Sequence, residues 1–170
     1  MEICMKIYVI RVISLFLAVL TAAMIFSFSA DTAKESSKIS SEITDKVLSS
    51  VGIDKETTPP ADYEKTKSKT EFSIRKLAHF AEYCLFGFFL CIFFRTFDRV
   101  FWLTLLFSLG VAVPYAALDE WHQSFVPGRS PVAKDVLIDS AGALVGAVVA
   151  LFAWYLVIRI LEKRKMKKLA

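Results

Sequence analysis

The sequence predicts an all-α integral membrane protein, a bundle of four transmembrane helices with one amphipathic helix in the loop after the first span. Of the 170 residues 55% are hydrophobic, a larger apolar share than a soluble domain usually carries, and the mean hydropathy is positive, at +0.51. Four apolar runs are also long enough to cross about 30 Å of hydrocarbon, which takes about 20 helical residues. We expect a single domain over 1–170, with spans at about 8–28, 74–94, 100–118 and 136–158.

The first apolar run begins near Lys6 and Arg11 and is followed by small polar residues and Asp31. A basic start, an apolar centre and a small-residue end also describe a signal peptide, and cleavage here would leave three spans. The length of the run favours an uncleaved membrane anchor.

The distribution of Lys and Arg predicts the orientation, because short loops rich in these residues face the cytoplasm. The N-terminus carries Lys6 and Arg11, and the loop between the second and third spans carries Arg95 and Arg99. The loop 31–73 has nine acidic residues, seven lysines and no arginine. We therefore expect a cell-membrane protein with both termini in the cytoplasm and no nucleic-acid partner. The basic residues of the tail are Arg159, Lys163, Arg164, Lys165, Lys167 and Lys168.

Five apolar residues of the loop 31–73 recur at the spacing of a helix face. Asp31 or Thr32 can cap this helix, and Gly52 stands where it would stop. An interfacial helix on the outer leaflet and a solvated helix packed on the bundle are both open. The five residues are Ile39, Ile43, Val47, Leu48 and Val51.

The second span begins with ionisable residues. Arg75, His79 and Glu82 are spaced i, i+4 and i+7, so they share one face of a helix. A charge near mid-bilayer costs about 3 kcal/mol, so His79 and Glu82 are expected to face the bundle interior. We expect Lys76 to snorkel to the headgroups. The plain alternative is that His79 and Glu82 form an internal pair without function.

The end of the third span carries a second polar group. If the helix continues, Asp119 faces His122 and Gln123, while Glu120 points elsewhere. A carboxylate beside an imidazole raises its basicity, which suits a general base or a metal ligand. Arg129 follows a Pro-Gly turn and has the forked geometry that holds phosphate or carboxylate. A capped, salt-bridged loop is the structural alternative.

The fourth span starts at Asp135 and carries Asp139 one turn deeper, followed by Gly142 and Gly146 on the same face. Small residues let another helix approach closely, and packing inside the bundle is favoured over dimerisation. Asp139 is expected to look inward, because facing lipid is costly for a carboxylate.

The second and fourth spans are expected to begin at the outer membrane face, and the third is expected to end there. These polar segments should therefore meet at one end of the bundle. We expect one shared polar site without a metal or cofactor, because no HExxH or CxxC spacing is present. A divalent metal among these residues is the weaker alternative. The candidate catalytic residues are His79, Glu82, Asp119 and His122, and the candidate ligand-binding residues are Arg75, Gln123, Arg129, Asp135 and Asp139.

Three sequence elements together carry a family resemblance: Phe26-Ser27-Phe28-Ser29, the run Arg75-Lys76-Leu77-Ala78-His79-Phe80-Ala81-Glu82-Tyr83, and the run Asp119-Glu120-Trp121-His122-Gln123-Ser124-Phe125-Val126-Pro127-Gly128-Arg129, followed by Asp135, Asp139 and Gly142. The sequence resembles the VanZ-like family, named for a protein associated with resistance to teicoplanin, a lipid-anchored glycopeptide. The resemblance implies a bacterial membrane protein with an antibiotic phenotype more firmly than it implies a reaction.

Three functions compete at this point. The leading one is an outer polar site that engages an anionic lipid-linked or cell-wall headgroup and lowers susceptibility to teicoplanin-type antibiotics. The second is a membrane-embedded hydrolase or transferase acting on a lipid-phosphate or peptidoglycan precursor. The third is a small transporter or proton relay, which the lack of polar residues deeper in the spans disfavours. Membrane lipids are the expected partners, and the oligomeric state is open.

Overall fold

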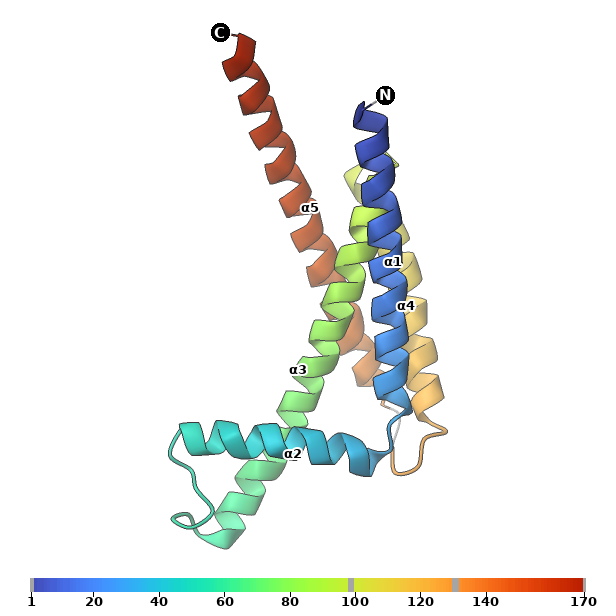
Figure 1. Cartoon of the computed structure of the whole chain (residues 1–170). Helices are drawn as coiled ribbons and strands as arrows, with labels where there is room; N and C mark the ends of the chain where they lie inside the picture. The colour runs from blue at the N-terminus through green and yellow to red at the C-terminus, as the bar shows by residue number, and fades with distance from the viewer. Residues whose placement is uncertain (1, 98–99, 130–131, 170) are drawn as a thin grey trace.

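The computed structural model describes residues 2–97, 100–129 and 132–169, and these form five helices without a strand (Figure 1). The all-α prediction is therefore confirmed. The helices are α1 (Glu2–Ala30), α2 (Ala33–Ser50), α3 (Pro60–Arg95), α4 (Phe101–Gln123) and α5 (Ala133–Leu169).

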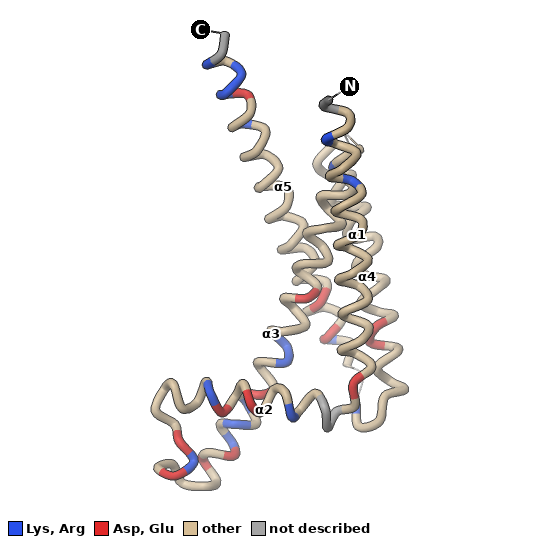
Figure 2. Tube along the Cα trace, viewed as in Figure 1, with Lys and Arg blue, Asp and Glu red and all other residues tan. Residues whose placement is uncertain are grey.

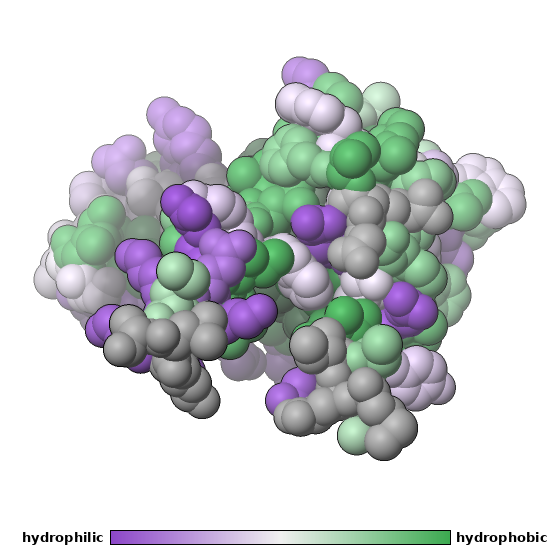
Figure 3. All heavy atoms as spheres, turned by 90° about the horizontal axis from the view of Figure 1, so that it is seen from above, coloured by the Kyte–Doolittle hydropathy of each residue, from purple (hydrophilic) through white to green (hydrophobic). Residues whose placement is uncertain are grey.

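Within the described residues, four helices are long and apolar enough to cross a membrane, namely α1, α3, α4 and α5. They enclose the expected spans except for Val100, which directly precedes α4. Large hydrophobic side chains such as Phe16, Leu106 and Phe152 are more than half exposed on them, as a lipid-facing surface requires. In the view along the bundle, hydrophobic residues dominate much of the surface and hydrophilic ones gather towards one side (Figure 3). The chain is a multi-pass membrane protein.

The two chain ends lie at one end of the bundle, and α2 lies crosswise at the other, where α3 continues past it (Figure 1). Basic residues mark the tips of α1 and α5, whereas acidic residues gather at the α2 end of the bundle (Figure 2). Arg99 and the side chain of Lys168, both counted among the basic topology signals, lie outside the described residues. The predicted meeting of the ionisable residues at one end is confirmed.

The closest helix packing joins α3 and α5. A methyl group placed on Gly142 would overlap the carbonyl of Phe80, and one on Gly146 would overlap the carbonyl of Cys84. Gly87 of α3 is equally tight against the backbone of α5. The small residues thus serve packing within the bundle, as expected, and they fix the start of α5 against the polar part of α3.

The helix α2 confirms the amphipathic helix expected in the loop. Its end has the paired hydrogen bonds of a Schellman motif, Ile53 N–H to the Leu48 carbonyl and Gly52 N–H to the Ser49 carbonyl, with Gly52 at φ +78°. A positive φ is nearly free for glycine, which explains the stop at this residue. At the other end the Thr32 carbonyl accepts the first helical bond, from Ser36 N–H.

The face of α2 that packs on α3 is not the apolar stripe itself. Ser40, Thr44 and Leu48 are buried, while Ile39 and Ile43 stay substantially exposed. The packing of α2 on the bundle is therefore confirmed, and α2 still presents exposed isoleucines. Contact with a lipid leaflet stays a prediction.

Candidate functional site

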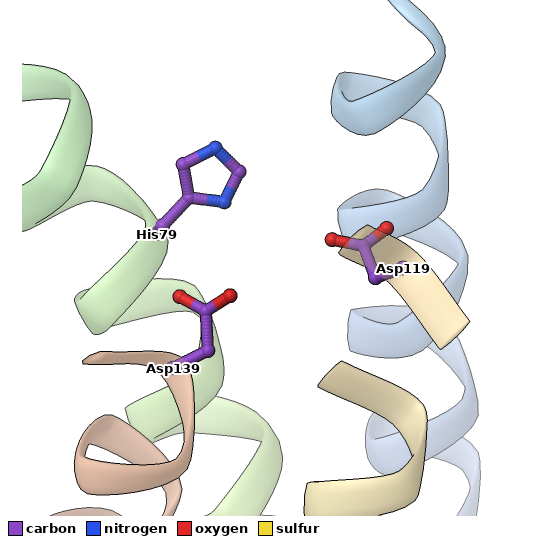
Figure 4. A group of neighbouring side chains, drawn as sticks. All are labelled: His79, Asp119 and Asp139. Atoms are coloured by element: carbon purple, nitrogen blue, oxygen red, sulfur yellow. The ribbon is translucent and has the colours of Figure 1, made fainter. Parts of the chain in front are cut away.

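The candidate site lies at the α2 end of the bundle, where three helices each bring one ionisable side chain to a common point. His79 of α3, Asp119 of α4 and Asp139 of α5 have ligand-capable atoms within 4.8 Å of one another (Figure 4). The three side chains meet because α3 and α5 enter the bundle at this end, whereas α4 ends at it. Asp139 faces inward as expected, with only 3% of its surface exposed.

Asp119 is held on one side by hydrogen bonds. Its Oδ2 accepts from Ser29 Oγ at 2.9 Å and from Gln123 Nε2 at 3.2 Å, and Gln123 Nε2 also contacts Ser29 Oγ at 3.0 Å. The expected pairing of Asp119 with Gln123 is confirmed. Ser29 was not among the candidate residues, although it closes the first apolar run, because spacing within one helix cannot show what a residue 90 positions away contacts.

His122 is placed differently from the expectation that it would pair with Asp119. Its ring stacks on Phe26 of α1, with centroids 4.5 Å apart and planes 26° apart, and Nδ1 has no hydrogen-bond partner in the described chain. A residue at i+3 can turn to either flank of its neighbour, and here an aromatic ring on α1 attracts the imidazole. The imidazole close to Asp119 is that of His79.

The predicted common face of α3 is confirmed. His79 Nδ1 and Glu82 Oε2 lie 3.8 Å apart, which is an ion-pair contact without a hydrogen bond, and both side chains are about three-quarters buried. Arg75 donates from Nη1 to Ser37 Oγ of α2 at 3.4 Å. All three line one cavity.

This cavity lies between α2 and the bundle, and its volume is about 190 Å³. Its walls combine guanidinium groups and other ionisable groups with aliphatic side chains, so it has polar and apolar parts. The residues that line it are Phe28, Asp31, Ser36, Ile39, Ser40, Ile43, Ile74, Arg75, Ala78, His79, Glu82 and Arg129.

Arg129 has a structural role at the same place. Nε donates to the carbonyl of Asp31 at 3.1 Å and Nη2 to that of Phe28 at 2.9 Å, so the guanidinium satisfies carbonyls at the end of α1. Burial lowers the pKa of Arg129, Asp119 opposes that shift, and the group stays charged. Arg129 therefore secures the cavity wall and presents positive charge to it.

A second cavity, of about 10 Å³, adjoins the first through His79 and is lined also by Asp135 and Asp139. Lys76 forms an ion pair with Asp135 here, a partner that the sequence did not indicate, and its snorkelling to the headgroups stays a prediction. The acid that begins α5 lies close enough to neutralise the amine.

Glu120 was expected to point away from the polar group, and it does turn from Asp119. It is nevertheless buried, and it accepts a hydrogen bond from Val132 N–H just before α5. It also lines the small cavity with Gln123. A carboxylate next to a backbone donor at a helix start is a common cap, but the sequence gives no sign of which helix start it reaches.

The chain matches the model of a known family. The model of the VanZ/LLP1 family matches residues 14–156, a range that holds every candidate residue, all of α3 and α4 and the larger part of α1 and α5. Neither the curated proteins nor the solved structures include a match to this chain. With its charged start of α3, the polar end of α4 and Asp139 of α5 all inside the matched range, the chain belongs to the VanZ/LLP1 family.

Proposed function

We propose that this VanZ-like protein binds the anionic headgroup of a lipid-linked or cell-wall molecule in the 190 Å³ cavity, and thereby lowers susceptibility to teicoplanin-type glycopeptides. The observation that carries the proposal is the mixed lining of the cavity. Arg75 and Arg129 supply two guanidinium groups, and Ile39, Ile43 and Ile74 supply an apolar wall. A lipid headgroup has the same two parts, an anion and the start of an aliphatic chain.

The chemistry of the cavity suits phosphate or carboxylate. The fork of Arg75 can give two parallel hydrogen bonds to either anion. Arg129 contributes mainly positive charge, because its Nε and Nη2 already donate to backbone carbonyls at the end of α1. Glu82 and His79 beside the arginines can accept or donate a proton to a bound headgroup. Binding at the edge of the bundle keeps an attached lipid chain in the bilayer, alongside the exposed isoleucines of α2.

The proposal places the cavity on the outer face of a bacterial cell membrane and both termini in the cytoplasm. The tips of α1 and α5 carry basic residues such as Lys6, Arg11 and Arg159, and basic ends face the cytoplasm (Figure 2). The outer face is where cell-wall precursors and glycopeptides are accessible.

Headgroup binding can be tested with purified protein in neutral detergent, using short-chain phosphatidylglycerol as the anionic probe and phosphatidylcholine as the neutral one. We expect saturable binding of the anionic lipid that Arg75→Gln weakens at least about ten-fold, the equivalent of about 1.4 kcal/mol. Arg159→Gln removes the same charge from an exposed position at the other end and serves as the control. Equal loss in both variants would indicate unspecific attraction to charge and reject the site.

The antibiotic role needs a cellular test. Teicoplanin and vancomycin inhibitory concentrations are measured in a susceptible host with a Gram-positive-type envelope, expressing the wild-type chain, Glu82→Ala or the control Glu162→Ala at matched membrane levels. We expect a rise for teicoplanin with the wild type and the control but not with Glu82→Ala, because only Glu82 lines the cavity. An unchanged concentration with every chain would reject the antibiotic role and leave headgroup binding to the first test.

A second candidate function is supported by the grouping of His79, Asp119 and Asp139, which offers proton transfer or ligation next to the cavity. The protein would then hydrolyse or transfer a lipid-phosphate or cell-wall precursor. Glu82→Gln separates the two functions, since loss of turnover with retained binding indicates an enzyme. A transporter is less well supported, because the acidic residues gather at one end of the bundle (Figure 2).

A further inference from the structure

We propose that His79, Asp119 and Asp139 form a binding site for a divalent transition-metal ion, for which zinc is the probe. One imidazole nitrogen and two carboxylate oxygens come from three different helices and converge on one point (Figure 4). Zinc uses these ligand types, and a site with three protein ligands leaves a fourth position for water or a bound molecule. The site does not depend on the headgroup proposal.

The separations suit a metal after a small adjustment. Three atoms at most 4.8 Å apart share a point that lies at most about 2.8 Å from each of them. Zinc bonds to nitrogen and oxygen are about 2.0–2.2 Å long, so each ligand atom needs to move inward by about 0.7 Å. Side-chain rotation alone can supply that movement while the helices stay in place.

Unpartnered buried oxygens provide an independent sign of a cation. Asp119 and Asp139 are 4% and 3% exposed, and the Oδ1 atom of each has no hydrogen-bond partner in the described part of the chain. Two such carboxylates facing each other are unfavourable unless a cation or a proton joins them. Lys76, the amine that lines the adjacent small cavity, already pairs with Asp135.

The surroundings of Asp119 also match those of a metal ligand. Ser29 and Gln123 hold its Oδ2, which leaves Oδ1 without a partner and available to a ligand, and ligating carboxylates are usually oriented by such outer hydrogen bonds. The cavity of about 10 Å³ beside His79 and Asp139 has room for about one water-sized occupant. His79 lines both cavities, so the ion would lie one side chain away from the larger one.

The test is zinc binding by the full chain, purified in detergent with a tag that contains no histidine and stripped of metal by a chelator. Zinc content is measured after equilibrium dialysis, and cobalt is used in parallel because its visible spectrum reports coordination. We expect one tightly bound zinc per chain. His79→Asn, Asp119→Asn and Asp139→Asn should each weaken binding by about 100-fold or more, and Ser29→Ala by about ten-fold through the orientation of Asp119.

Asp62→Asn is the matched control, because it makes the same change at an exposed residue of α3 that lies outside the proposed ligand set and both cavities. It should change zinc affinity by less than about three-fold. If the carboxylate variants do not fold, the cobalt spectrum of the wild-type chain and the zinc affinity of Ser29→Ala still test whether the metal binds at this site. A wild-type chain that takes up no zinc, or zinc binding that Ser29→Ala and the ligand variants leave unchanged, would reject this metal site.

Discussion

The two ends of the bundle both carry charged residues, but they use them differently. At the end with the termini, Arg11 donates to the Thr96 side chain and carbonyl and stacks on the ring of Phe97, while Arg159 and Glu162 form an exposed pair. At the α2 end, Asp119 and Asp139 are buried between helices. Charge at a helix tip is cheap because water reaches it, whereas buried charge must be stabilised by specific partners. Burial, rather than the presence of charge, therefore separates the candidate site from the topology signals.

The largest predicted effect on stability comes from a substitution that breaks the contact between α3 and α5, which holds the buried end of the bundle together. Gly142→Ala pushes a methyl group into the Phe80 carbonyl, and the α3–α5 pair must separate. We expect a loss of about 3 kcal/mol or more in the free energy of unfolding, the upper end of the usual range for overpacking, because the methyl group would meet backbone atoms that cannot rotate away. Gly110→Ala is the control, since a methyl group there meets open space. Thermal unfolding in detergent measures both, and equal melting temperatures for the two variants would contradict the close packing.

A smaller effect is predicted for the support of Asp119. Ser29→Ala removes one of the two hydrogen bonds to Oδ2 and leaves a buried carboxylate less satisfied, which should cost about 1–3 kcal/mol. Ser14→Ala is the control on the same helix, because Ser14 is also buried but bonds only to the backbone of its own helix. Denaturant unfolding compares the two, and an equal cost would mean that Asp119 needs no support from α1.

The end with the termini should tolerate loss of charge better. Arg11→Gln removes two hydrogen bonds to Thr96 and should cost about 1 kcal/mol, because water can replace part of the contact. It should leave zinc and headgroup binding within about two-fold of the wild type. A strong loss of ligand binding in this variant would show that the two ends are coupled and that charge at the end with the termini also supports the site.

The smallest effect concerns pH and the outer helix. A hydrogen bond from Lys67 lowers the pKa of Asp45 below its usual value, so the ionised form is favoured in the folded protein. The resulting stabilisation is present above the unfolded-state pKa of about 3.9 and is lost as the pH falls through the lower folded-state value. Because the pair is partly exposed, we expect a melting-temperature change of only about 1–2 °C. Asp45→Asn should remove it between pH 5 and pH 3, and an unchanged pH profile would contradict the pairing.

The helices and their common polar end could be predicted from the sequence, because apolar length and period depend on local residues. The stop at Gly52 and close packing at Gly142 were accessible in the same way, although the sequence did not show that α3 is the partner. Helical spacing also placed Arg75, His79 and Glu82 on one face.

The partners across helices could not be predicted. Spacing places a side chain on a face of its own helix but does not reveal the residue on the next helix. Asp119 therefore meets His79, 40 positions away, instead of the nearer His122, and Lys76 meets Asp135. The hydrogen bonds of Ser29 to Asp119 and of Glu120 to the backbone before α5 likewise depend on how the helices pack, so spacing within one helix does not reveal them.

The contact between Arg129 and the end of α1 has a consequence for how the chain is made. Its hydrogen bonds join positions 98 and 101 residues apart, and Ser29 is synthesised 90 residues before its partner Asp119. At about 5–20 residues per second, α1 is synthesised about 5–20 s before these partners. It lies in the membrane without these partners during this interval, which fits its being the most hydropathic of the four spans. Arg129, between α4 and α5, thus fixes the end of α1 only after that helix has entered the membrane.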